Sequence, residues 1–272
     1  DLTQVDQMYK TYQPTHVVHL AARVGGIVEN IKYPYDYFEE NILMNSNVIA
    51  MAKKYNVDRL IAMGTSCAYP NVVDTYPMKE LDLFMGPPAQ SNFSYAITKR
   101  AMVAQIDACN IQYDTKYNYL MACNIYGEHD NFHDGEKMHF ITALIKKIQD
   151  AKKSNSDIIN LFGTGAPLRQ FMHAHDLARV VKAVIENDIT DSFNIAPPDQ
   201  NYSIDQMARL ALDAMDKSMD INYDSTKPDG QYNKEICTNR LTSILPKFKF
   251  MSFKEGIIQT IKNQTTKKEN NE

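Results

Sequence analysis

The stretch Arg59-Leu-Ile-Ala-Met-Gly-Thr65 is an almost unbroken apolar run that ends in a hydroxyl residue. Such runs are typical of central strands in parallel sheets, because helices cover both faces of those strands. Two further runs, at residues 16–20 and 116–122, have the same character. Apolar residues recur at helical spacing over residues 34–55 and 95–110. This alternation predicts an α/β fold with a doubly wound parallel sheet.

The pattern changes after Gly127. A polar loop at 128–137 precedes an expected helix at 138–152, and Ser203-x-x-Gln206 and Ser252-x-x-Glu255 have the spacing of capping boxes that open further helices. Short strands are expected at 158–162, 192–196 and 220–223, with a helix at 176–187. We therefore predict a doubly wound domain of residues 1–127 plus parts of 170–200, and a smaller α/β lobe of residues 128–169 and 200–272.

Composition excludes several classes of protein. The 272 residues are 44% hydrophobic with a net charge of −4, and no basic cluster is interleaved with aromatic residues, so a nucleic-acid partner is not expected. No apolar span approaches the roughly 18 residues that would cross a membrane. The four cysteines, Cys67, Cys109, Cys123 and Cys237, form no C-x-x-C pair, which argues against a zinc knuckle or redox motif. We expect a cytoplasmic location.

The stretch Ser94-Tyr-Ala-Ile-Thr-Lys99 places a phenol and an amine on one face of an expected helix. An ammonium close to a phenol lowers the pKa of the phenol, which lets Tyr95 exchange protons near neutral pH. Thr65 closes its strand, and ligands of open α/β sheets bind at the carboxyl ends of strands. A Tyr–Lys pair alone is common on solvated helix faces. Here the pair follows His19-Leu-Ala-Ala22 and Thr65 along the chain, and this order favours a catalytic role for Tyr95 and Lys99.

This ordered set resembles the extended short-chain dehydrogenase/reductase superfamily, in which Ser or Thr, Tyr and Lys form the catalytic triad. Over nearly the whole chain, further blocks resemble the GDP-L-fucose synthase family: Ala21-Ala-Arg-Val-Gly-Gly-Ile27, Ser66-Cys-Ala-Tyr-Pro70, Asn124-Ile-Tyr-Gly127, Asp130-Asn-Phe-His133 and Lys227-Pro-Asp-Gly230. The resemblance implies a Rossmann-like fold. It also implies NADPH-dependent 3,5-epimerisation and 4-keto reduction of GDP-4-keto-6-deoxy-D-mannose, by a homodimer built on the helices at 34–55 and 95–110.

The resemblance also implies roles for single residues. The catalytic set would be Thr65, Tyr95 and Lys99, with Cys67 and His139 as the epimerisation pair. The NADP(H) contacts would be Ala21, Ala22, Met63, Gly64, Thr65, Ser66, Lys99, Ala122, Cys123, Asn124, Ile125 and His139. The contacts with the GDP-sugar would be Lys147, Phe162, Arg169, Asp229 and Lys234.

No metal ligands are expected. His129, His133 and His139 lie in a segment rich in Asp and Asn without a thiolate partner. His173 and His175 match no ligand position of the family, so we expect them to be core or surface polar residues.

One expected motif is missing, because no G-x-G-x-x-G or G-x-x-G-x-x-G occurs in the chain. Such a turn holds the cofactor pyrophosphate at a helix N-terminus. We expect roughly 30–40 residues, about one βαβ unit, to precede Asp1. Two other interpretations stay open: another nucleotide-sugar 4-epimerase or dehydratase of the superfamily, and a non-catalytic protein that binds sugar nucleotides.

Overall fold

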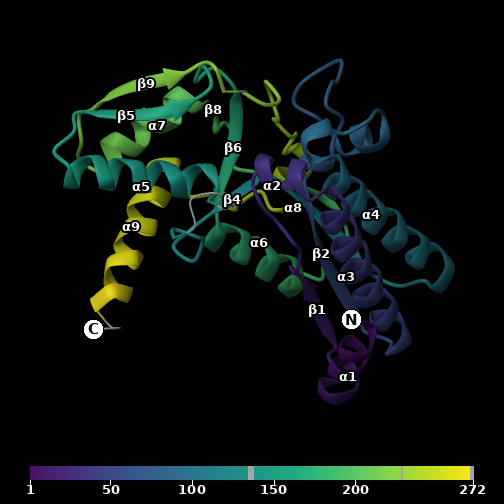
Figure 1. The fold of residues 1–272 in the computed structure, drawn as a ribbon. Helices are drawn as coiled ribbons and strands as arrows, with labels where there is room; N and C mark the ends of the chain where they lie inside the picture. The colour runs from purple at the N-terminus through teal and green to yellow at the C-terminus, as the bar shows by residue number, and fades with distance from the viewer. Residues whose placement is uncertain (134–137, 228, 270–272) are drawn as a thin grey trace.

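A four-stranded parallel sheet lies at the centre of the larger part of the molecule (Figure 1). The computed structural model describes residues 1–133, 138–227 and 229–269. The strands of this sheet run in the order β1 (His16–His19), β2 (Arg59–Thr65), β3 (Asn118–Ala122) and β7 (Phe193–Ile195). Every neighbouring pair is parallel. The run at 59–65 is an inner strand, buried along almost its whole length.

Helices cover both faces of this sheet (Figure 1). On one face, Leu60 and Ala62 pack with α1 (Leu2–Tyr12), α3 (Pro34–Lys54) and α4 (Phe93–Tyr113). On the other face, Ile61 and Met63 share a core cluster with α6 (Ala174–Glu186). Since side chains alternate between the two faces of a strand, an all-apolar β2 needs helices on both faces. The prediction of a doubly wound α/β fold is confirmed.

A smaller group of elements lies beside the large sheet (Figure 1). Strand β6 (Leu168–His173) pairs in parallel with β4 (Asn124–Tyr126) and antiparallel with β8 (Asn201–Ser203). Strands β5 (Ile158–Phe162) and β9 (Asp220–Asp224) form a separate parallel pair. Helices α5 (Phe140–Lys153), α7 (Ile204–Ala214) and α9 (Phe253–Glu269) enclose two further core clusters against these strands.

Most of the expected elements are present, and four were missed. Both capping boxes form: Gln206 N donates to Ser203 Oγ at 3.0 Å, and Ser252 N donates to Glu255 Oε2 at 2.8 Å. The missed elements are β6, β8, α2 (Ile27–Lys32) and α8 (Asn239–Ile244). Three of them are short, and the polar residues of β6 break the apolar run by which a strand is recognised. Residues 134–137 of the expected polar loop lie outside the described residues.

Two observations bear on the environment of the protein. None of the helices in the described ranges combines the length and the apolar character needed to cross a bilayer. All four cysteines carry free thiols.

Candidate active site

The carboxyl ends of the parallel strands meet along one edge of the large sheet. The strand register places Thr65 of β2 beside Ala122 of β3, and Ala122 beside Ile195 of β7. The expected cofactor positions at 21–22, 63–66 and 122–125 therefore come together at this edge. After β1, Asn41 of α3 fixes the turn, because its side chain accepts from the backbone N–H of Arg23 at 2.9 Å and donates to its carbonyl at 3.0 Å.

Lys99 is a deeply buried ionisable group at this edge. Its side chain reaches from α4 to the sheet, where Nζ donates to the carbonyl of Met63 at 2.7 Å, and the residue is only 2% exposed. Burial lowers the pKa of Lys99 to about 8. Its Nζ lies 5.9 Å from the centre of the Tyr95 ring. The sequence-based expectation that the phenol and the amine share one helix face is confirmed.

The prediction that Lys99 lowers the pKa of Tyr95 is wrong: in this structure the pKa of Tyr95 is raised. Burial raises the pKa of Tyr95 above its ordinary value, and the nearby Cys67 sulfur adds to the effect. The physical reason is the direction of the amine: Lys99 donates to a backbone carbonyl of β2 instead of to the phenol oxygen. The spacing predicted the shared face correctly, but it could not predict the direction of the lysine side chain.

Cys67 lies directly after the strand end. Thr65 caps the 3₁₀ turn Ser66–Ala68, with its Oγ1 accepting from Cys67 N at 3.2 Å. The sulfur of Cys67 accepts from Nζ of Lys234 at 3.5 Å. Arg169 also lies within electrostatic reach: burial lowers the pKa of Arg169, and the neighbouring Cys67 opposes that shift. The structure thus brings Cys67 together with Tyr95, Arg169 and Lys234.

Lys234 comes to the site on an extended segment that is held from two sides. Isolated bridges pair Asn233 with Leu168 of β6, and Ile236 with Met78 of the loop after β2. The buried Gln170 side chain accepts from Ile236 N at 2.9 Å. These pairings join parts of the chain that are far apart in sequence, so no local pattern predicts them.

His139 stands at the start of α5 and pairs with a carboxylate. Its Nδ1 lies 3.1 Å and 3.2 Å from the two oxygens of Asp130, and Oδ2 of that group also accepts from Thr142 Oγ1 at 2.6 Å. The hydrogen bond that His139 donates to Asp130 raises the pKa of His139, with burial opposing it. Asp130 opens the Asp130-Asn-Phe-His133 block, and nothing in the sequence predicts its partnership with His139. A carboxylate that orients an imidazole is a common arrangement in acid–base sites.

The other expected substrate residues form a second group on β5 and its neighbours. Lys147 of α5 donates to the carbonyl of Asn160 at 2.6 Å, and its Nζ lies 4.8 Å from the centre of the Phe162 ring. Phe162 is 66% exposed. Asp229 accepts from the backbone N–H and the hydroxyl of Thr164, at 2.7 Å and 2.8 Å.

A glycine permits this approach of Asp229. Gly163 has a φ of 79°, and a Cβ there would lie 2.2 Å from Asp229 Oδ1. Asp229 in turn lies near enough to Arg169 to raise the pKa of that guanidinium against the effect of burial. The two substrate groups are therefore neighbours.

His173 is buried and the His175 side chain is 45% exposed, so the expectation of core or surface polar residues is confirmed, but the two rings lie side by side. Among the described residues, they and Glu128 form the one group of at least three side chains whose donor atoms are close enough to share a metal ion. The sequence signal for this group is weak, since Glu128 lies 45 residues before His173.

The chain matches known proteins along most of its length. The NAD dependent epimerase/dehydratase family model matches residues 1–196. A GDP-L-fucose synthase of Dictyostelium discoideum is 38% identical over 92% of this chain and 78% of its own. A GDP-L-fucose synthase of Escherichia coli (strain K12) is 31% identical over 89% of this chain and 77% of its own.

Solved structures agree with these matches. The crystal structure of a GDP-L-fucose synthetase from Naegleria fowleri bound to NADP has a TM-score of 0.88 and 28% identity. The match covers 99% of this chain and 82% of that one.

Proposed function

Because this chain belongs to the NAD dependent epimerase/dehydratase family, and within it to the GDP-L-fucose synthases, we propose that it converts GDP-4-keto-6-deoxy-D-mannose to GDP-L-fucose with NADPH. One observation of the site carries the proposal. Tyr95 and the buried Lys99 face Thr65 and Cys67 at the end of β2, while Arg169 and Lys234 approach the same sulfur from another part of the chain.

Epimerisation needs a base and an acid on opposite faces of the sugar carbons. The protons on C3 and C5 are acidic because an enolate can form with the neighbouring ketone. In our proposal, Cys67 acts as the base that takes the proton from each carbon, and protonated His139, hydrogen-bonded to Asp130, donates a different proton from the other face. Between the two carbons, Cys67 gives up its proton to solvent and His139 takes one back. The hydroxyls of Thr65 and Tyr95 stabilise the ketone oxygen while negative charge develops on it.

Reduction uses the same hydroxyl pair. NADPH, when bound, supplies the hydride that reduces C4. Tyr95 donates the proton to the C4 oxygen, and its raised pKa keeps the phenol protonated before that transfer. Lys99 would hydrogen-bond the nicotinamide ribose from its buried position.

The residues present fit the nicotinamide-ribose end of NADP(H). The buried amine of Lys99 lies near the strand ends, where small residues let a flat ring approach the backbone closely. These are Ala21, Ala22, Gly64 and Ala122, with Met63, Ser66, Cys123, Asn124 and Ile125 adjoining them. No glycine-rich turn for the pyrophosphate occurs among the 272 residues.

The GDP part of the substrate would lie across the smaller lobe. Arginine and lysine suit a diphosphate, because the guanidinium donates two hydrogen bonds and the ammonium acts as a point charge. Arg169 and Lys234 would take this role next to Cys67, while Lys147, Phe162 and Asp229 would hold the nucleoside. In this division, residues 1–127 with parts of 170–200 bind the cofactor, and residues 128–169 and 200–272 bind the substrate.

Two further properties belong to the same proposal. A homodimer through α3 and α4 would cover apolar side chains that are now exposed, such as Phe38 and Leu43 of α3 and Ile111 of α4. Light scattering on the purified protein would measure its mass. A cytoplasmic location suits the four free thiols, since disulfides are rare in reducing compartments.

The direct test is product identification. The protein expressed from its complete reading frame is incubated with GDP-4-keto-6-deoxy-D-mannose and NADPH, and the sugar nucleotide is identified by NMR. We expect GDP-L-fucose and one NADPH oxidised per product. A sugar that is isomerised without net NADPH consumption would indicate a 4-epimerase instead. If the substrate binds unchanged, the protein is a non-catalytic binder.

The roles of single residues need a second test. In D₂O, Cys67→Ser should slow deuterium incorporation at C3 and C5 by at least tenfold, whereas hydride transfer to a ketone that is already epimerised should continue. Cys109→Ser is the matched control, because Cys109 lies on α4 and packs into a core cluster that does not include Cys67. Normal exchange in the Cys67 variant would remove that residue from the epimerisation.

A further inference from the structure

Three metal-ligand side chains meet outside the proposed active site, where α6 begins. Glu128 follows β4, His173 ends β6, and His175 lies in the first turn of α6. Nε2 of His175 is 3.1 Å from Glu128 Oε1, and Nε2 of His173 is 3.5 Å from Glu128 Oε2. One donor atom from each residue lies within 4.8 Å of the others. Two imidazoles and a carboxylate form a familiar ligand set for zinc.

One of these donors is buried without a hydrogen-bond partner. His173 is 2% exposed, and its Nε2 makes no hydrogen bond to the described residues. The separation of 3.5 Å from Glu128 is longer than that of a good hydrogen bond. The His173 ring packs edge-on against Tyr126 and against His175, which holds Nε2 toward the carboxylate. Buried polar atoms of native proteins nearly always have a partner.

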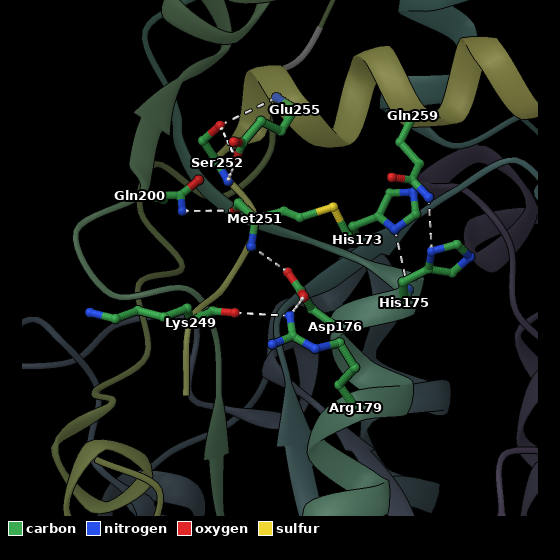
Figure 2. A network of polar contacts seen from close by, with 10 residues as sticks. All are labelled: His173, His175, Asp176, Arg179, Gln200, Lys249, Met251, Ser252, Glu255 and Gln259. Atoms are coloured by element: carbon green, nitrogen blue, oxygen red, sulfur yellow. Dashed lines mark hydrogen bonds and ion pairs between the residues drawn. The ribbon is translucent and has the colours of Figure 1, made fainter. Parts of the chain in front are cut away.

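Polar side chains of α9 hold the other two ligands. Asn263 donates to Glu128 Oε1 at 2.8 Å, and Gln259 Nε2 lies 3.2 Å from Nδ1 of His175. Figure 2 shows Gln259 reaching from α9 to His175 beside the start of α6. In metal sites, such outer hydrogen bonds orient the ligands. The His175 side chain is 45% exposed, so an ion can enter from solvent.

We propose that Glu128, His173 and His175 bind one Zn²⁺ ion, with water in the fourth position, and that this ion fixes α9 against the start of α6. Binding asks for a change of tautomer in both imidazoles. Nδ1 of His175 faces the amide nitrogen of Gln259, which is a donor, so the neutral His175 ring carries its proton on Nε2, and a flip of the Gln259 amide would let its oxygen accept from Nδ1 instead. His173 Nδ1 now accepts from His175 N at 3.2 Å, so the neutral ring carries its proton on Nε2. Coordination through Nε2 moves the proton to Nδ1 and gives up this single capping bond, which the metal–imidazole bond replaces.

Zinc titration of the tag-free, chelator-treated full-length protein tests the site. Isothermal titration calorimetry should show one saturable site with a Kd below about 1 μM, and Zn²⁺ should raise the melting temperature. Glu128→Gln and His175→Ala should each weaken binding by at least 100-fold. His16→Ala is the matched control, because His16 lies at the far end of β1 and should leave binding unchanged.

A second probe distinguishes failed binding from failed folding. Circular dichroism and the melting temperature without metal should be the same in wild type and Glu128→Gln, while Co²⁺ gives visible absorption typical of a tetrahedral site only in the wild type. No saturable zinc binding, or binding that survives both substitutions, would overturn the proposal and leave the cluster as a hydrogen-bonded contact or a water site.

Discussion

The two halves of the candidate active site are held in different ways. At the strand ends, Lys99 is 2% exposed and bonded to the backbone of β2, and Thr65 caps its own turn. On the smaller lobe, Phe162 is 66% exposed and the half-buried Lys147 lies against its ring. A rigid, buried group is suited to chemistry, because its geometry costs nothing to organise during the reaction. An exposed face is suited to binding a large, polar ligand. Substitutions should therefore change kcat in the first region and KM in the second.

The largest effect is expected for the phenol. Tyr95→Phe removes the proton donor and should lower kcat by about 10²–10⁴-fold, with little change in KM and an unchanged melting temperature. Steady-state kinetics with NADPH oxidation measures both constants. Tyr9→Phe is the control, since Tyr9 is fully buried and its hydroxyl donates to the Val48 carbonyl far from the strand ends. A loss below tenfold in Tyr95→Phe would mean that another group supplies the proton.

Asn194 tests whether the strand-end region is rigid because of its polar core. Its side chain is fully buried, accepts from the Tyr69 hydroxyl at 2.6 Å, and donates to the carbonyls of Met78 and Cys237. Asn194→Ala leaves these partners unsatisfied and should cost about 3 kcal/mol of unfolding free energy, measured by urea denaturation.

The matched change on the smaller lobe should be nearly silent. Asn222 is exposed on β9, and its side chain donates to Asn160 Oδ1. Asn222→Ala should change the unfolding free energy by no more than about 0.5 kcal/mol. Equal losses in the two variants would contradict the distinction between a rigid and an adaptable region.

The difference between the strand ends and the smaller lobe also explains which parts of the site could be predicted from the sequence. The carboxyl ends of β1, β2 and β3 were predictable because apolar runs specify a parallel sheet, and its topology brings those ends together. Lys234 reaches Cys67 only through bridges between distant segments, so its place came from family resemblance alone. The pairing of Asp130 with His139 depends on how one loop folds back. The direction of Lys99 depends on a rotamer, which helical spacing does not specify.

A smaller effect is expected for Lys147, on the adaptable face. Lys147→Met should raise the KM for the GDP-sugar about tenfold and leave kcat within twofold, because it removes binding that is equal in ground and transition states. Lys146→Met is the control, since Lys146 pairs with Asp150 on the exposed side of α5. A loss in kcat instead would place Lys147 in the chemistry.

The smallest effect concerns the pH dependence of His139, at the start of α5. The hydrogen bond that His139 donates to Asp130 raises the pKa of His139. Asp130→Asn keeps the shape of the partner and removes its charge, so the pKa of His139 should fall toward 6.5. Two-dimensional NMR of the imidazole carbons would measure the shift, and an unchanged pKa would mean that Asp130 does not set the charge of this ring.

The raised pKa of His139 also predicts how the unfolding free energy should change with pH. A folded-state pKa above the unfolded value stabilises the fold at pH below about 6.5, and this contribution disappears as the pH rises through the folded-state pKa. The difference between wild type and Asp130→Asn should therefore narrow with rising pH. Because His139 is 37% exposed, the pH-dependent part should stay below about 1 kcal/mol. If the difference widened with pH, His139 would be neutral in the fold. It could not then serve as the acid that donates a proton to the sugar carbons.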